Sequence, residues 1–303
     1  MIKTTFFGTF EFAAKILEAV ANDSRFEIIQ VVTQPDQPAG RGKTELREPP
    51  VKILAKKLGI PVTQPETLKD LKIEPVDVNI LVEYGKLIPE QIYNAPKFGT
   101  INIHPSLLPK WRGATPLQSA LLNGEITGGV SIMKIDSTLD HGPILGQKTF
   151  DIMPTEKFTE LRDRVAPIAA DFLLQILPDY IAGKNSPVPQ DDSAATFCRE
   201  LTRADGHINL QASTADIYNH FRAFYPWPGS YVFLDNKRIK LLELSPADHQ
   251  ITAGKIVFEK DKIFVGTRDG AIEILSLQME GKQALVAKDF INGNQALDGA
   301  QLA

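Results

Sequence analysis

The chain has 303 residues, enough for two domains of ordinary size. Hydrophobic residues make up 43% and charged residues 23%, which is typical of a globular protein whose core needs neither a metal nor a disulfide for stability. The formal net charge of -4 argues mildly against a dedicated nucleic-acid module, although a basic patch on one face can still attract RNA. One cysteine, no charged leader with an apolar run and no apolar stretch of membrane-spanning length together predict a cytoplasmic location.

Short apolar runs alternate with helical patterns in the first half of the chain. Buried strands are predicted over residues 2–7, 26–33, 76–82, 100–103 and 130–135, and helices over residues 11–20, 51–58 and 117–122. This alternation is typical of an α/β fold, a Rossmann-like, mostly parallel sheet with flanking helices. Functional sites on such sheets form at the carboxyl ends of the strands.

The second half changes character twice. A helical period covers residues 155–180, where Pro167 is expected to kink or restart the helix. Residues 184–203 are polar and proline-bearing at their start and are predicted to be a linker. Short strands over 231–234, 239–244, 254–258, 263–265 and 272–277 then predict a small OB-like β-barrel. The predicted domains are therefore residues 1–183 and 204–303.

Three polar residues stand out near predicted strand ends. Asn102 and His104 are two positions apart, so their side chains leave the same face of the strand, and Asp140 follows another strand. Two neighbouring strand ends can bring Asp140 close to His104. The same patterns also occur in structural turns, and the residues taken alone leave that alternative open.

Such a trio suits acyl transfer to an amine. An amide and an imidazole, those of Asn102 and His104, can donate hydrogen bonds to the oxyanion of a tetrahedral intermediate. A carboxylate, that of Asp140, can pair with a protonated His104 and relay protons through a bound water. No serine or cysteine is placed to suggest a covalent intermediate.

Sequence motifs spread over nearly the whole chain carry a family resemblance. They include Gly8-Thr9-X-Glu11-Phe12-Ala13, residues 33–43, Tyr84-Gly85-Lys86-Leu87-Ile88-Pro89, Asn102-Ile103-His104 running into Ser106-Leu107-Leu108-Pro109, Trp111-Arg112-Gly113-Ala114, Leu139-Asp140-X-Gly142, and residues 222–229 and 275–278. Taken together, these motifs resemble the folate-dependent formyltransferases, and within that superfamily most closely those that act on methionyl-tRNA.

This resemblance implies a reaction and a set of site residues. The donor would be 10-formyltetrahydrofolate, the acceptor the methionine amino group of initiator tRNA, and no metal would take part. Asn102, His104 and Asp140 would be the catalytic trio. The folate site would be lined by Ser106, Leu107, Leu108 and Pro109, with the strand end at Tyr84 and Gly85 beside the pterin.

The long loop between Gln34 and Pro50 is a candidate tRNA contact. Strand-to-helix connections in α/β units are usually two to six residues long, and longer ones are generally functional or disordered. The resemblance implies that Arg41 and Lys43 are the main contacts with the acceptor stem, and Lys52, Lys56 and Lys57 continue the positive charge onto the next helix. The barrel is a second tRNA-contact candidate through its phosphate-binding lysines and arginines. We expect a monomer that does not engage a membrane.

Three residues depart from the family pattern: Phe10 stands where proline is usual, Glu83 where a small residue is commoner, and His141 where threonine is usual. His141 is expected to point away from the site, to the surface. Enzymes that formylate a nucleotide-linked amino sugar, or that hydrolyse formyl-folate, would share the trio and remain alternatives. A non-catalytic nucleotide-binding protein is disfavoured because Gly8-Thr9-Phe10-Glu11 lacks the G-x-G-x-x-G spacing.

Overall fold

The computed structural model of the chain describes residues 1–39, 45–69 and 71–303. It divides into two compact units, and each is described by itself. The first unit consists of Met1–Pro116, Thr127–Asp151 and Arg162–Arg199, and the second of Leu117–Ile126, Ile152–Leu161 and Glu200–Ala303. None of the described helices is both long and apolar enough to cross a membrane.

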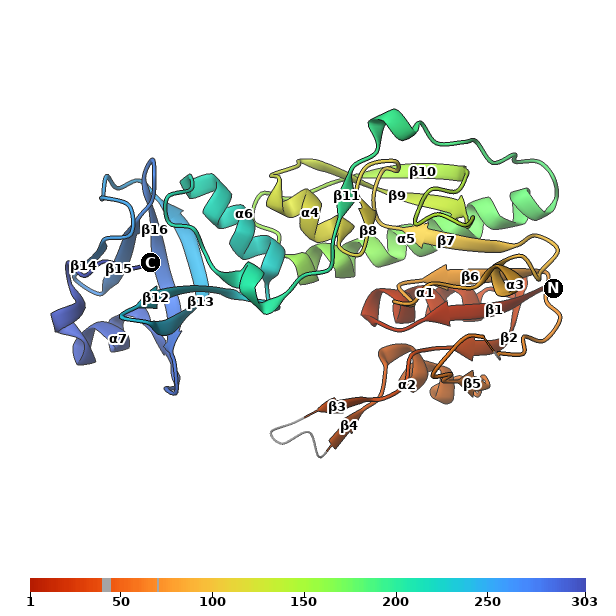
Figure 1. Cartoon of the computed structure of the whole chain (residues 1–303), viewed down its shortest axis with the longest axis horizontal. Helices are drawn as coiled ribbons and strands as arrows, with labels where there is room; N and C mark the ends of the chain where they lie inside the picture. The colour runs from red at the N-terminus through yellow and green to blue at the C-terminus, as the bar shows by residue number, and fades with distance from the viewer. Residues whose placement is uncertain (40–44, 70) are drawn as a thin grey trace. The chain divides into compact units, whose positions relative to one another are not determined.

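The first unit is built on a seven-stranded sheet with the strand order β10-β9-β7-β6-β1-β2-β5 (Figure 1). Five neighbouring strands run parallel: β1 (Ile2–Gly8), β2 (Phe26–Val32), β5 (Val62–Thr63), β6 (Val78–Val82) and β7 (Thr100–His104). β9 (Thr127–Lys134) is antiparallel to β7, and β10 (Ile144–Asp151) is antiparallel to β9. The predicted mostly parallel α/β sheet is confirmed. Strand β10 is an addition that the sequence patterns did not predict.

Helices alternate with these strands along the chain. Their bounds are α1 (Glu11–Asn22), α2 (Pro50–Lys57), α3 (Glu90–Tyr93), α4 (Pro116–Leu122) and α5 (Phe158–Ile181). All but α3 fall where the sequence shows a helical period, and nearly all of α4 and the start of α5 belong to the second unit. On α1, the spacing of Phe12, Ile16 and Val20 puts three fully buried side chains on one stripe. A short hairpin, β3 (Gln37–Ala39) with β4 (Glu45–Arg47), precedes α2.

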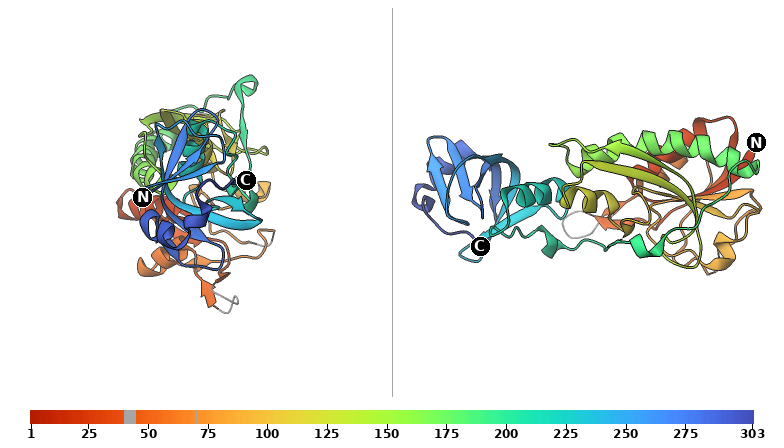
Figure 2. Two further views of the ribbon diagram at one scale, coloured as in Figure 1. Left: turned by 90° about the vertical axis from the view of Figure 1, so that its left-hand side faces the viewer. Right: turned by 90° about the horizontal axis from the view of Figure 1, so that it is seen from above.

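Helix α5, the long green helix in Figure 2, is a single element that contains Pro167, so of the two expected effects of this proline, a kink or a restart, the restart is wrong. A proline has no N–H to donate to the carbonyl four residues earlier, which here is that of Asp163. The ammonium of Lys15 on α1 donates to that carbonyl instead, at 3.4 Å. Leu161, Val165 and Leu173 are fully buried, and this apolar stripe helps to hold the helix together across the interruption.

The second unit also holds an antiparallel sheet and two further α-helices. The strands are β12 (Ser230–Leu234), β13 (Lys237–Ala247), β14 (Ile256–Glu259), β15 (Lys262–Gly266), β16 (Ala271–Met279) and β17 (Ala284–Val286), in the order β12-β13-β16-β15-β14 with β17 on β16. The helices are α6 (Thr214–Phe224) and α7 (Ala287–Gly293). A turn at Asp235 and Asn236 joins β12 to β13, and both residues have the positive φ that tight hairpins require.

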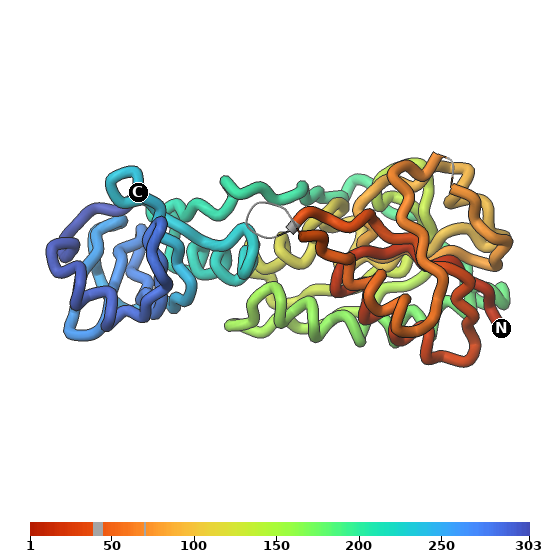
Figure 3. Tube along the Cα trace, turned by 90° about the horizontal axis from the view of Figure 1, so that it is seen from below, coloured from red at the N-terminus to blue at the C-terminus, as the bar shows by residue number. Residues whose placement is uncertain are grey.

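The C-terminal residues connect the two edge strands of this sheet. Ala303 exchanges two backbone hydrogen bonds with Phe233 on β12, at 2.6 and 2.8 Å. Three residues earlier, the carbonyl of Ala300 accepts the N–H of Ile256 on β14 at 3.0 Å. The end of the chain, marked C in Figure 3, therefore forms hydrogen bonds with both edge strands of this antiparallel sheet.

Residues 188–198, which fall within the predicted linker, pack onto the first unit. Val188 forms an antiparallel bridge with Ile144 on β10. Further on, β11 (Phe197–Cys198) pairs in parallel with β8 (Arg112–Gly113), which follows the loop after β7. We call residues 188–198 the strap, because they run from β10 to β8 along the part of the unit that carries the polar trio.

Candidate active site

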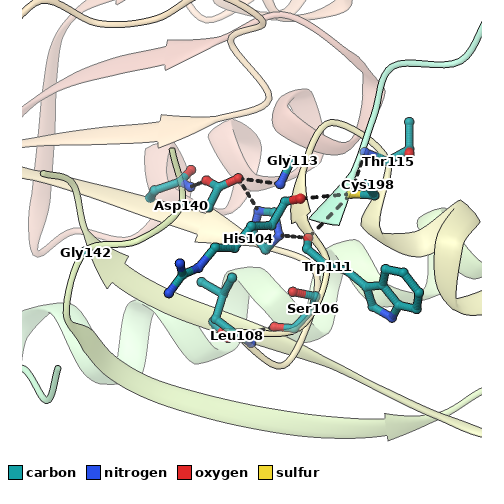
Figure 4. A network of polar contacts seen from close by, with 12 residues as sticks. His104, Ser106, Leu108, Trp111, Gly113, Thr115, Asp140, Gly142 and Cys198 are labelled. Carbon is teal, nitrogen blue, oxygen red and sulfur yellow. Dashed lines mark hydrogen bonds and ion pairs between the residues drawn. The ribbon is translucent and has the colours of Figure 1, made fainter. Parts of the chain in front are cut away.

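The structure brings Asn102, His104 and Asp140 together, and Figure 4 shows His104 beside Asp140. Asn102 and His104 lie on β7, and Asp140 lies on the loop that follows β9. The Asn102 amide donates to Asp140 Oδ1 at 3.3 Å, and His104 Nδ1 lies 3.7 Å from Asp140 Oδ2. The side chains of His104 and Asp140 are only 6% and 11% exposed, so the two groups interact with little solvent between them.

Asp140 is held in an unusual backbone conformation. Its φ of 48° lies in the left-handed region, which aspartate tolerates better than most residues. The N–H of Gly113 donates to its Oδ2 at 2.8 Å, and with the amide of Asn102 this gives both carboxylate oxygens a donor. The carboxylate is thereby directed at the imidazole.

The imidazole of His104 is oriented from its other side. Its Nε2 lies 2.8 Å from the carbonyl oxygen of Trp111. A carbonyl only accepts, so Nε2 carries a proton and Nδ1 is the nitrogen that faces Asp140. The trio thus holds an amide, an imidazole and a carboxylate in a fixed relation, as general acid–base chemistry requires.

The loop after β7 uses many of its polar groups internally. Ser106 Oγ donates to the carbonyl of Lys110 at 2.6 Å. The N–H of Leu108 donates to Ser131 Oγ, while the carbonyl of Leu108 accepts from Gln147 at 2.9 Å. Leu107 packs against Gly129, where a Cβ would come within 2.2 Å of it. The loop expected to line a folate site, Ser106 to Pro109, is therefore firmly fastened to β9 and β10.

Tyr84 and Gly85 follow β6 in the same sheet. The Tyr84 ring is 2% exposed and packs edge-on against Phe7 in the core. Its carbonyl accepts from Thr9 Oγ1 at 3.0 Å and from the Gln34 amide at 2.8 Å. Gly85 has a φ of 79° and lies close to Gln34: a Cβ added to Gly85 would come within 2.4 Å of the Nε2 atom of Gln34. Only their remaining backbone groups are left to face a ligand.

Glu83 stands just before them, also with a left-handed backbone, at a φ of 43°. Burial raises the pKa of its carboxyl group to about 7, an effect that Arg162 opposes and Glu11 reinforces. A carboxyl group in this range exchanges its proton near neutral pH, which is unusual for a glutamate. This departure from the family pattern therefore has an electrostatic consequence at the edge of the sheet that carries the trio.

Two of the predicted tRNA contacts, Arg41 and Lys43, lie outside the described residues. The positive charge expected on the following helix is largely balanced. Lys52 Nζ lies 2.7 Å from Asp36 and 3.0 Å from Glu48, and Lys56 also pairs with Glu48. Asp36 comes from the start of the loop, so the loop base is tied to α2 by paired charges. Helix α2 therefore offers a partner less unpaired positive charge than its three lysines suggest.

The side chain of His141 is 37% exposed, which agrees with the expected surface position. Its ring bridges two carboxylates outside the trio: Nδ1 lies 2.6 Å from Asp136 and Nε2 lies 3.2 Å from Asp192 in the strap. The hydrogen bond with Asp136, followed by that with Asp192, raises the pKa of His141. The ring therefore fastens the loop of Asp140 to the strap.

Sequence reasoning missed the groups that hold the trio in place. Trp111 and Gly113 were named only as parts of a sequence motif and Gln190 only as part of a linker, so none of them was expected to contact the trio. Arg112 is 4% exposed, and a buried arginine indicates a network of polar groups around it. The burial of this residue becomes visible only in the structure.

Comparison with known proteins places these residues in a family. Residues 2–177 match the model of the family described as formyl transferase, and residues 200–295 match the family described as formyl transferase, C-terminal domain. The methionyl-tRNA formyltransferase of Thermodesulfovibrio yellowstonii is 40% identical over 97% of this chain and 96% of its own. That of Dehalococcoides mccartyi is 38% identical over 99% and 98%.

A solved structure shares the fold. A sugar 3N-formyl transferase, crystallised in the presence of dTDP and 5-N-formyl-THF, superposes with a TM-score of 0.69. The superposition covers 93% of this chain and 99% of that one, at 20% sequence identity. The arrangement of both units' elements is therefore that of known formyltransferases.

Proposed function

The chain belongs to the formyl transferase family, and we propose that it transfers the formyl group of 10-formyltetrahydrofolate to the amino group of methionine on initiator tRNA. The observation that carries this proposal is the identity of 40% to a methionyl-tRNA formyltransferase over nearly the full length of both chains. The convergence of Asn102, His104 and Asp140 supplies chemistry suited to that reaction.

In the proposed reaction, the amine nitrogen attacks the formyl carbon and a tetrahedral oxyanion forms. The bond from that carbon to the folate nitrogen then breaks. The attacking nitrogen loses a proton and the folate nitrogen gains one, so tetrahydrofolate leaves and the overall charge balances. The trio is proposed to stabilise the oxyanion and to move these protons.

Each member of the trio has a distinct part in this proposal. The Asn102 amide has two N–H groups, of which one donates to Asp140, so the second is available to the oxyanion. His104 sits beside it with Nε2–H on the Trp111 carbonyl, and in its protonated form it would add positive charge next to the oxyanion. Asp140 is the acceptor through which a water can pass the proton between the two nitrogens.

The substrates define two further proposed surfaces. Folate is proposed to lie along Ser106, Leu107, Leu108 and Pro109, with its pterin against the backbone at Tyr84 and Gly85. The tRNA is proposed to contact Arg41 and Lys43 and, through phosphates, the barrel of residues 204–303. In this division of labour residues 1–183 carry out catalysis and residues 184–203 connect the two parts of a monomeric, cytoplasmic enzyme.

A formylation assay tests the function directly. The protein is incubated with 10-formyltetrahydrofolate and, in parallel, with methionyl initiator tRNA, with a nucleotide-linked amino sugar, or with water alone as the acceptor. We expect formyl-methionyl-tRNA, with Arg41→Ala slowing this reaction and leaving folate affinity intact. Formylation of the sugar without formylation of the tRNA would overturn the proposal, and formate release without either acceptor would indicate a hydrolase.

A further inference from the structure

We propose that Gln190, in the strap of residues 188–198, is a positioning residue that sets the place of Asp140 beside His104. The inference rests on the proposed formyl transfer, because it concerns the geometry of the same site. It gives a chemical task to a segment whose sequence predicts only a linker. The contacts behind it all lie within the first unit.

The amide of Gln190 stands between two carbonyl groups of the Asp140 loop. Its Nε2 donates to the carbonyl of Asp140 at 2.9 Å and to that of Gly142 at 2.8 Å. Two carbonyl oxygens that point at one place repel each other unless a donor lies between them. An amide NH2 group has two N–H bonds and can satisfy both. The left-handed turn at Asp140 is thus stabilised by a side chain fifty residues away along the chain.

The turn leaves little room for another arrangement. A Cβ at Gly142 would come within 1.9 Å of the carbonyl oxygen of Lys134 on β9, so the backbone passes close against that strand. Asp140 has a φ of 48°, in the left-handed region that a non-glycine residue in a free loop seldom adopts. Contacts from outside the loop are therefore needed to keep the carboxylate of Asp140 where Gly113 and His104 meet it.

Arg112 determines which way the Gln190 amide faces. Its Nε and Nη2 donate to Gln190 Oε1 at 3.2 and 2.8 Å, and this fixes the amide oxygen on the arginine and the NH2 group on the two carbonyls. Arg112 precedes Gly113, whose N–H donates to the Asp140 carboxylate. Arg112 thus supports the backbone of Asp140 indirectly, by orienting Gln190, and its neighbour Gly113 supports the carboxylate of Asp140 directly.

The strap is fastened at a second point by Asp192. Its Oδ1 accepts from Arg112 Nη2 at 2.7 Å, and its Oδ2 lies 3.2 Å from His141 Nε2. The hydrogen bond from Arg112 lowers the pKa of Asp192, which keeps the carboxylate ionised for both partners. His141 is the residue next to Asp140, so the strap holds the Asp140 loop on both sides of the turn.

Asn185, which precedes the strap, offers a matched control. It is half-buried like Gln190, and its Nδ2 donates to the carbonyl of Leu145 on β10 at 2.8 Å. Both residues thus use a side-chain amide to fasten the chain to a backbone carbonyl of the first unit. Only Gln190 does so at the Asp140 turn. If the amides served only to anchor the chain, substitutions of Asn185 and of Gln190 would both lower activity. If Gln190 positions Asp140, only the substitution of Gln190 would lower it.

The test compares Gln190→Glu with Asn185→Asp, each of which replaces the amide by a carboxylate of nearly the same shape. In Gln190→Glu the contact with Arg112 is kept, so the strap stays attached, but the two donors to the Asp140 loop are lost. We expect kcat for formyl transfer to methionyl-tRNA to fall about 10- to 100-fold, since a displacement near 1 Å at a reacting group has effects of this order. The KM values for folate and tRNA and the melting temperature should stay close to those of the wild type. Asn185→Asp should retain the wild-type kcat.

A pH profile adds a readout that loss of stability would not give. Protonation of the carboxylate introduced by Gln190→Glu restores one donor to the loop. The deficit of this variant relative to the wild type should therefore shrink as the pH falls. An unchanged kcat in Gln190→Glu, or an equal loss in both variants, would overturn the positioning role.

Crystal structures of the two variants separate this inference from the proposed function. We expect the carboxylate of Asp140 to move away from His104 Nδ1 in Gln190→Glu and to keep the 3.7 Å separation in Asn185→Asp. An undisturbed Asp140 in Gln190→Glu would contradict the inference whatever the enzyme acts on. A wild-type protein that does not formylate methionyl-tRNA would contradict only the proposed function.

Discussion

The trio has a strand side, formed by Asn102 and His104, and a loop side, formed by Asp140, and different contacts hold each side in place. Asn102 and His104 lie on β7, a fully buried central strand whose ladder with β6 and β9 fixes their directions. Asp140 lies on a loop, in a left-handed backbone, and depends on contacts from Gly113 and Gln190. The strand side follows from local sequence, whereas the loop side depends on residues far along the chain. The predictions below test how much of the chemistry depends on each side.

The largest effects should come from the trio itself. His104→Ala and Asp140→Asn should each lower kcat at least ~100-fold, because each removes a group proposed to stabilise the oxyanion or to move a proton. The measurement is steady-state formylation of methionyl-tRNA at saturating folate, with folate affinity measured separately by titration. Wild-type turnover in either variant would remove that residue from the proposed mechanism.

Gly113→Ala should come next, because it disturbs only the loop side. The new Cβ would lie 1.9 Å from the carbonyl oxygen of Cys198, so the backbone must shift and the N–H that holds Asp140 at 2.8 Å must shift with it. We expect kcat to fall about tenfold or more. Gly59→Ala is the control, since Gly59 also has a positive φ but has nothing within 4 Å of a Cβ. Equal activity in both variants would mean that Gly113 does not support the site.

Glu83→Gln should change stability in a pH-dependent way. The pKa of Glu83 in the folded chain, about 7, lies above its ordinary value of 4.5, so ionisation is disfavoured by folding. The wild type should therefore lose stability as the pH rises from 4.5 to 7, and the variant should not. Above pH 7 the variant should be more stable by about 2–3 kcal/mol.

Denaturant unfolding at pH 5 and pH 8 measures this difference. Glu18→Gln, at an exposed position on α1, is the control and should show no such dependence on pH. A Glu83→Gln variant that is no more stable than the wild type at pH 8 would show that the carboxyl group is not held in a desolvated place.

His141→Gln should have the smallest effect, since the His141 side chain is 37% exposed. The carboxylates of Asp136 and Asp192 raise its pKa above 6.5, so its ion pairs add stability below that pH and lose it as the pH rises through the raised pKa. The variant should melt below the wild type at pH 6 and approach it at alkaline pH. A melting temperature that differs equally at both pH values would exclude the charge as the cause.

The difference between the strand side and the loop side also explains which features could be predicted from the sequence. The parallel strands, α1 and the pair Asn102 and His104 follow local periodicity, which is visible in the sequence alone. β10 was missed because its residues alternate irregularly between buried and exposed positions, with three exposed in a row at Gln147 to Thr149 in a strand at the sheet edge. At Pro167, the carbonyl of Asp163 that lacks its helical donor accepts a hydrogen bond from Lys15, on another helix. Long-range partners such as these leave no local pattern.

Trp227 shows the same limit in the second unit. Tryptophan side chains are on average well buried, yet Trp227, between two prolines, is 52% exposed. Residue type predicts burial only on average, and here the buried aromatic rings of this segment are those of Phe221 and Phe224. Arg41 and Lys43 could not be compared with the fold, because they lie outside the described residues.

A double-substitution cycle of His104 and Asp140 tests the central claim most directly. If the imidazole and the carboxylate act as one unit on the same reacting carbon, His104→Ala combined with Asp140→Asn should lower the rate of a single formyl transfer to methionyl-tRNA about as much as the more damaging single substitution does. Losses that multiply, so that the double variant is slower by the product of the two single effects, would show that the two residues act independently and would contradict the account.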